Sequence, residues 1–158
     1  MSQETEQDLP QISVSAQYIK DLSFENAAIP GSIKIENPPT IDLNLDINVS
    51  KLSETDFFEV ALTVHVKAMH NADVLFILEV IYAGIFHLAN IAPEKQNMAL
   101  GVHCASMLFP YLRKIVADTT QYGGFQPLMM DPIDFSRLYL KRMQENQNNS
   151  ESDKNPKN

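Results

Sequence analysis

The chain is poor in the residue types that several classes of protein require. Its 158 residues include a single cysteine, five glycines and no tryptophan. One cysteine forms no intramolecular disulfide, which is typical of a reducing compartment, and we expect a cytoplasmic protein. The first residues lack the basic start of a signal peptide, and no apolar run reaches the roughly 20 residues that span a bilayer. We therefore expect no direct insertion into a membrane.

Positive charge is also scarce, with 12 Lys and Arg residues against 20 Asp and Glu residues and a formal net charge of −8. Binding to nucleic acid depends on Lys and Arg side chains that neutralise phosphates. The composition therefore argues against nucleic acid as a partner, and a basic protein segment fits the charge better.

The sequence shows no catalytic constellation and no cofactor or metal motif. The histidines are His65, His70, His87 and His103. They lack the spacing of metal ligands, and the glycines form no phosphate-binding loop. Cys104 lies in an apolar helical pattern, where cysteines are usually inert. A hydrolase that uses Glu79 as general base stays open as a minor alternative, since aliphatic neighbours raise the pKa of a carboxyl group.

What the chain does have is strong alternation of apolar and polar residues in its first half. Residues 41–49 and 57–69 alternate with a period of two, which predicts strands with one buried and one wet face. Ile12, Val14, Ala16 and Tyr18 predict an earlier strand, followed by a loop through Phe24 and Pro30. Short breaks separate the later strands, so these should form an antiparallel meander.

Residues 74–86 differ because both alternating sets are apolar, so the predicted strand must be covered on both faces. We expect the chain's own helices on one face, and a second copy or a ligand on the other. Leu78, Val80 and Tyr82 are the residues that we place at a subunit interface. Glu79 interrupts the pattern, and is either neutralised inside or faces water.

The pattern becomes helical after Pro93 and continues to Tyr122, with Pro110 predicting a kink or a division near Phe109. Asp131 and Pro132 predict the start of a second helix that ends near residue 143. The expected fold is α+β, a four-stranded antiparallel sheet packed on a long kinked helix and a shorter C-terminal helix. Residues 1–9 and 144–158 are expected to be flexible or disordered polar tails around a single domain, residues 10–143.

Apolar side chains in the predicted loops suggest a surface for extended peptides, although such side chains more often pack on the core. A protein that binds unfolded clients would use these side chains together with apolar ones from strand 41–49 and from the helical segment. The candidate client-binding residues are Phe24, Ile29, Ile33, Leu43, Leu45, Phe125 and Leu128.

Several stretches, in order along the chain, resemble the family of the bacterial protein-export chaperone SecB. They are YIKDLSFE at residues 18–25, EV-YAGIF at 79–86, LFPY-R at 108–113, and GGF-PL followed by DPIDF at 123–135. Together they cover roughly residues 11–143. The chain differs from the usual family pattern at Ala105 and Gln126, where the family commonly has proline.

The resemblance implies a four-stranded antiparallel sheet with two helices, assembled as a dimer of dimers. It also implies a function without ATP: the chaperone holds precursor proteins unfolded and delivers them to the translocation ATPase SecA. Asp21, Glu25 and Glu79, with Ile77 beside them, match the family's residues that receive the basic, zinc-bearing C-terminal segment of SecA. The alternative is a generic apolar peptide- or ligand-binding module without a translocase partner.

Overall fold

The computed structural model describes residues 8–31, 37–53 and 55–152. Four strands come first, and the helices follow. The strands are β1 (Gln11–Asn26), β2 (Thr40–Lys51), β3 (Phe57–His70) and β4 (Asp73–Ala89), and the helices are α1 (Pro93–Met98), the π-helix η2 (Ala99–Cys104), α2 (Ala105–Tyr122) and α3 (Phe135–Ser152). The predicted α+β fold is confirmed.

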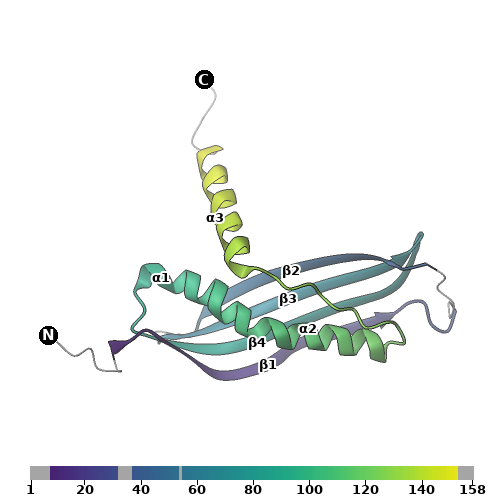
Figure 1. The fold of residues 1–158 in the computed structure, drawn as a ribbon, viewed down its shortest axis with the longest axis horizontal. Helices are drawn as coiled ribbons and strands as arrows, with labels where there is room; N and C mark the ends of the chain where they lie inside the picture. Colours follow the sequence, from purple (N-terminus) through teal and green to yellow (C-terminus); the bar gives the residue numbers. More distant parts are fainter. Residues whose placement is uncertain (1–7, 32–36, 54, 153–158) are drawn as a thin grey trace.

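The strands form one antiparallel sheet in the order β1-β4-β3-β2, as Figure 1 shows. Strands β2, β3 and β4 follow one another as the predicted meander. The tight turn between β3 and β4 uses Asn71 at a φ of 56°, a left-handed conformation that asparagine tolerates better than most residues. The chain enters β2 at the far edge from β1, so β1 and β2 are the two edge strands.

Strand β1 is longer than the alternation predicted, and two bulges interrupt its pairing with β4. One lies between Val14 and Ala16 and the other between Ile19 and Asp21. Each bulge adds a residue and therefore reverses which side chains point to which face. Ile12 and Val14 pair with residues of the helix-covered face, whereas Ala16 and Tyr18 lie on the opposite one. The four residues that predicted this strand consequently do not share a face.

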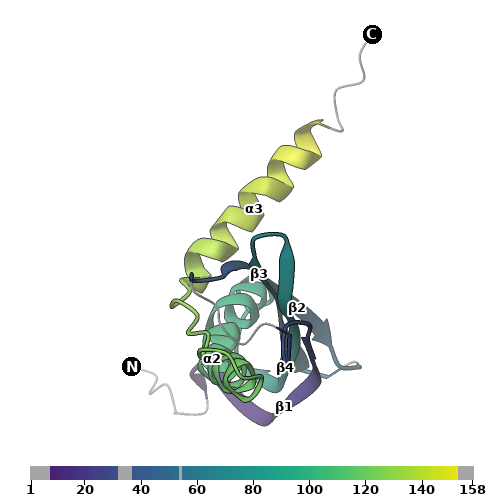
Figure 2. The same ribbon diagram turned by 90° about the vertical axis from the view of Figure 1, so that its right-hand side faces the viewer.

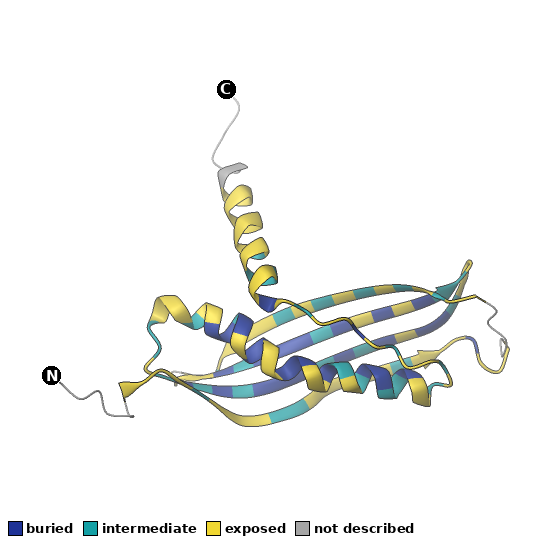
Figure 3. Ribbon diagram, viewed as in Figure 1, coloured by how far each residue is buried: buried dark blue, intermediate teal, exposed yellow. Residues whose placement is uncertain are grey.

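One face of the sheet packs on the helices, and we call it the helix-side face (Figure 2). Along β3 and β4, the side chains of this face are mostly buried and those of the opposite face are mostly more exposed, although Ala61 and Ala83 on the opposite face are buried as well (Figure 3). The largest fully buried side chains of the core are Phe86, Leu62, Leu78, Leu100, Leu108, Leu112, Val60, Val64, Val66, Val80, Val116 and Thr120. This core lies between α2 and the centre of the sheet.

The helical region from Pro93 to Tyr122 is continuous, so it is not divided near Phe109, and its π-helical part lies before Pro110. Pro110 lies within α2, while residues Ala99–Cys104 form a π-helix. The side chain of Ser106 donates a hydrogen bond to the carbonyl of Val102, 2.6 Å away, at this junction. Ala105, one of the departures from the family pattern, is completely buried there.

Helix α3 begins later than predicted and extends further. Asp134, rather than Asp131, accepts a hydrogen bond from the backbone N–H of Arg137 (3.1 Å), which is the geometry of an N-cap. The helix continues to Ser152, so residues 144–152 of the predicted disordered tail are helical. Gln and Glu are good helix formers even where nothing apolar is buried. Figure 1 shows α3 projecting away from the sheet.

Candidate partner-binding face

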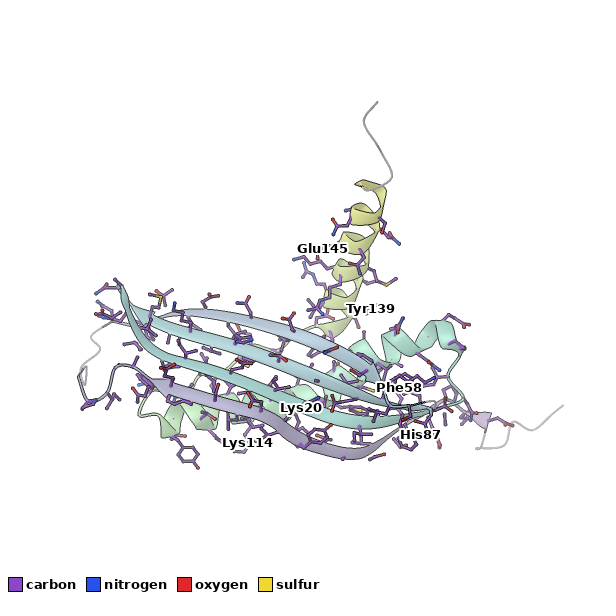
Figure 4. All side chains as sticks on the ribbon, turned by 180° about the vertical axis from the view of Figure 1, so that it is seen from behind. Lys20, Phe58, His87, Lys114, Tyr139 and Glu145 are labelled. Atoms are coloured by element: carbon purple, nitrogen blue, oxygen red, sulfur yellow. The ribbon has the colours of Figure 1, made fainter. Side chains whose placement is uncertain are left out.

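The sheet face opposite α2, the outer face, is seen in Figure 4 with α2 behind the strands. Pairing of β1 with β4 places Asp21 beside Ile81, Ser23 beside Glu79, and Glu25 beside Ile77. Paired residues in an antiparallel sheet point to the same face. The four side chains predicted to bind SecA, namely Asp21, Glu25, Ile77 and Glu79, therefore lie together on two neighbouring strands. We call them the acidic patch.

The acidic patch is accessible in the isolated chain. Asp21 and Glu25 are exposed, and Ile77 retains 41% of its surface. The Glu79 side chain is 35% exposed, so it faces water at the surface, which decides between the two environments expected for it. An exposed aliphatic side chain among carboxylates suits a segment that is both cationic and partly apolar.

Strand β3 supplies basic neighbours to the acidic patch. His65 pairs with Glu79, and its Nδ1 lies 3.5 Å from Glu79 Oε2. Lys67 is opposite Ile77. Sequence reasoning placed both residues on a wet face of their strand, but the pairing of β3 with β4 was needed to bring them beside the patch.

A second polar cluster on the outer face was missed by sequence reasoning. Glu59 accepts hydrogen bonds from the hydroxyl of Tyr18 and from Lys20 Nζ, the latter at 2.6 Å. These bonds, that from Lys20 first, lower the pKa of Glu59. Burial, and then the bond to Glu59, raises the pKa of Tyr18 to about 12. We call Tyr18, Lys20 and Glu59 the Glu59 cluster.

The residues predicted at a subunit interface lie on the helix-side face of β4, and their role in an assembly stays a prediction. Leu78 and Val80 have no exposed surface in the single chain, and Tyr82 retains 8%. They point to the helix-side face, where the Tyr82 ring stacks on Tyr111 at 5.9 Å between centroids. Within the chain, this apolar set therefore packs on the helices, and alternation alone does not say which of the two apolar faces the helices cover.

Three of the predicted client-binding residues meet at one end of the helix-side face. The rings of Phe24 and Phe125 both contact Phe76, with centroids 5.5 and 4.8 Å apart. Ile29 reaches the adjacent turn, where its Cδ1 would lie 3.0 Å from a Cβ added at Gly124. We call Phe24, Phe76 and Phe125 the aromatic cluster.

The other predicted client-binding residues are more dispersed. Leu43 and Leu45 lie on β2 and Leu128 follows α2, and all three are partly buried against the core. Ile33 lies outside the described residues. Phe24 itself belongs to β1 and not to a loop. Because it follows the bulge at Lys20, it pairs with Leu78 and its ring points to the helix-side face.

Hydrogen bonds hold the aromatic cluster in place, and sequence reasoning missed the residues that make them. Asn26 Nδ2 donates to the carbonyl of Gly123 (2.9 Å), joining the end of β1 to the end of α2. The buried Thr120 hydroxyl accepts from the N–H of Leu128 (2.9 Å), and Arg113 Nε donates to the carbonyl of Met130 (2.6 Å). The segment after α2 is therefore fastened along that helix.

Nothing in the described residues favours catalysis. Burial raises the pKa of the Cys104 thiol to about 12, so it remains protonated and a poor nucleophile. Within ranges 8–31, 37–53 and 55–152, no three His, Cys, Asp or Glu side chains are placed to hold a metal ion. None of the helices described is both long enough and apolar enough to cross a membrane.

Comparison with known proteins gives a consistent result. The family model described as preprotein translocase subunit SecB matches residues 5–146. The protein-export protein SecB of Rickettsia bellii (strain OSU 85-389) is 55% identical over 141 residues, covering 89% of this chain and 93% of that protein. That of Rickettsia felis is 52% identical over 146 residues, covering 92% and 96%.

Among solved structures, the SecB-like chaperone Rv1957 of Mycobacterium tuberculosis, in complex with a ChAD peptide from the Rv1956 HigA1 antitoxin, superposes with a TM-score of 0.65. It is 16% identical and covers 77% of this chain and 90% of its own, so this likeness shows the fold. The family match and the Rickettsia relatives show the family as well as the fold. The chain belongs to the SecB family, which consists of protein-export chaperones and not of enzymes.

Proposed function

We propose that this chaperone binds unfolded precursor proteins without ATP, as a homotetramer, and delivers them to SecA through the acidic patch. The observation that carries the proposal is the β1–β4 register, which gathers Asp21, Glu25, Ile77 and Glu79 on one exposed face. A basic, zinc-bearing tail would find there separated carboxylates around an aliphatic side chain. Exposed ion pairs are individually weak, but together they steer a charged partner to the surface.

Clients would bind the helix-side face and its edges, away from the acidic patch. The aromatic cluster lies between the end of β1 and the end of α2, and Ile29 beside it is exposed by 39%. Apolar contacts of this kind accept many sequences. The Mycobacterium tuberculosis relative, solved with a bound peptide, supports a peptide-binding role for the fold. The two partners would thus use opposite faces of one sheet.

Substitution of Glu79 by lysine tests the proposed SecA site. Glu79→Lys puts a positive charge at the centre of the acidic patch, opposite a cationic tail. We expect binding of a synthetic, zinc-loaded SecA tail peptide to weaken at least about tenfold, which is about 1.4 kcal/mol. Isothermal titration calorimetry at low salt measures this directly. The loss should shrink as salt is added, because exposed charges are screened.

The matched control is Glu94→Lys, a charge reversal of the same kind at an exposed position of α1. It should leave tail binding within about twofold, since Glu94 is not on the outer face. Both variants should retain the parent's mass in sedimentation and its suppression of client aggregation. Unchanged tail binding by Glu79→Lys would refute the site. Loss of clients and assembly together with the tail would show that the substitution damages the fold.

A further inference from the structure

The direction of the acidic side chains on β1 depends on the bulge at Lys20. Tyr18 pairs with Ala83 and therefore lies on the outer face, and Lys20 is the residue without a partner in the register. In an uninterrupted strand, the outer positions after Tyr18 would be Lys20, Leu22 and Phe24. The extra residue reverses this order. Asp21, Ser23 and Glu25 consequently point outward, and Leu22 and Phe24 point to the helix-side face.

The Glu59 cluster contacts both the bulged residue and the residue two positions before it. Glu59 lies on β3, two strands away from β1, and it reaches across β4 to Tyr18 and to Lys20. Tyr18 is the last regularly paired residue of the outer face before the bulge, and Lys20 is the bulged residue itself. The Glu59 side chain is only 16% exposed, so its carboxylate is shielded and its two bonds are geometrically fixed. A hydrogen bond to an ionised carboxylate is stronger than one between two neutral groups.

We propose that Glu59 is a positioning residue for the acidic patch: by fixing the bulge at Lys20, it keeps Asp21 and Glu25 on the outer face. The inference rests on the proposed function where it concerns the SecA tail. The register itself is independent of any partner. Glu59 acts through the two β1 carboxylates and does not need to touch the tail.

A simpler explanation would be that Glu59 adds one more negative charge to an acidic surface. Substitution of Lys20 distinguishes this charge effect from the proposed role of Glu59 in holding the bulge. Lys20→Met removes a positive charge and leaves Glu59 ionised and unpaired by lysine, so attraction by charge alone predicts tighter binding of a cationic tail. Loss of the bulge predicts weaker binding instead, because Asp21 and Glu25 are no longer held in place.

The experiment measures the zinc-loaded tail peptide on the parent, Lys20→Met, Glu59→Gln and the milder Tyr18→Phe. We expect the first two variants to bind about threefold to tenfold more weakly. The losses from Glu59→Gln and Glu25→Gln should not multiply in the double variant, because both act on the same carboxylate; independent residues would give additive free energies. Asp118→Asn removes an exposed Lys–Asp pair of the same 2.6 Å length on α2 and should change nothing.

A second measurement needs no partner. Nuclear magnetic resonance of the full chain reports whether Asp21 still lies opposite Ile81, through cross-strand contacts and the exchange rates of nearby amides. We expect weaker contacts and faster exchange in Lys20→Met and Glu59→Gln, with Tyr18→Phe in between. Tighter tail binding by Lys20→Met, or an unchanged register in both variants, would overturn the proposal. If the parent protein does not bind the tail peptide, the proposed SecA site is refuted. The pairing of Asp21 with Ile81 would still show whether Glu59 holds the bulge.

Discussion

The two faces of strand β4 differ sharply in burial, even between neighbouring residues. Leu78 is completely buried against the helices, whereas its neighbour Ile77 keeps 41% of its surface on the outer face. Both side chains are aliphatic and of equal size. What distinguishes them is the helix layer on one side only, so an exposed apolar side chain such as Ile77 should contribute little to folding. This comparison predicts different costs for matched substitutions.

The largest difference should come from removing the side chain at each position. Leu78→Ala should lower the free energy of unfolding by about 3 kcal/mol, since a fully buried leucine leaves a cavity. Ile77→Ala should lower it by less than about 1 kcal/mol, but weaken binding of the SecA tail. Urea unfolding at equal protein concentration measures both. Equal costs would mean that the outer face is also covered.

A smaller effect is expected at the crowded end of the helix-side face. A Cβ added at Gly123 would lie 2.3 Å from the Phe24 ring, so Gly123→Ala must displace that ring from Phe76. We expect a loss of about 1–3 kcal/mol in unfolding free energy, typical of overpacking. The backbone is not the cause, because φ at Gly123 is −71°.

Gly101→Ala is the control for this substitution, because its added Cβ would only touch the Tyr139 ring, at 3.4 Å. It should leave stability within about 1 kcal/mol of the parent. Client binding should fall in Gly123→Ala, while the SecA tail binds as before. Weaker tail binding would show that the two faces are coupled.

The smallest effect concerns how stability depends on pH, and it arises from Glu59 on the outer face. The pKa of Glu59 is lowered from 4.5 in the folded chain. Its ionised form therefore stabilises the fold above about pH 4.5, and this contribution is lost as pH falls further through the lowered value. Because Lys20 is half exposed, the contribution should be about 1 kcal/mol or less.

Comparison of the parent with Glu59→Gln isolates that contribution. Their difference in unfolding free energy should be constant near neutral pH and should shrink as the pH is lowered toward about 3. Carboxylates elsewhere titrate equally in both proteins and cancel. A difference in unfolding free energy that grows as the pH falls would contradict the lowered pKa of Glu59.

The sequence predicts well what is local and periodic. Strand β2 was recognisable because aliphatic and polar residues alternate without a break, and α1 begins at Pro93 as expected, since proline fits the first helical turn. The grouping of Asp21, Glu25 and Glu79 came from a family resemblance. Their shared face could not be derived from β1 alone, because a bulge leaves no mark in the alternation of Ile12 and Tyr18.

Contacts that are distant in sequence could not be predicted in the same way. Glu59 and Tyr18 are 41 residues apart, and only the sheet order brings them together. The packing of Leu78 on the chain's own helices could not be predicted for a related reason: two apolar faces look alike until the helices are placed. Pro110 was expected to disturb its helix, yet the irregular turns lie at residues 99–104, where no proline occurs.

The bulge at Lys20 lets β1 hold one residue more than β4 pairs with. Replacing Lys20 changes one side chain and leaves the number of residues between Tyr18 and Phe24 intact, so the strand keeps its faces only while the bulge persists. Deleting Lys20 would remove the extra residue and make Ile19 and Asp21 consecutive residues opposite Tyr82 and Ile81. Asp21 and Glu25 would still point outward and Phe24 would still point to the helix-side face, now in a regular strand. The deletion would therefore keep the same side chains on each face without any bulge for Glu59 to hold.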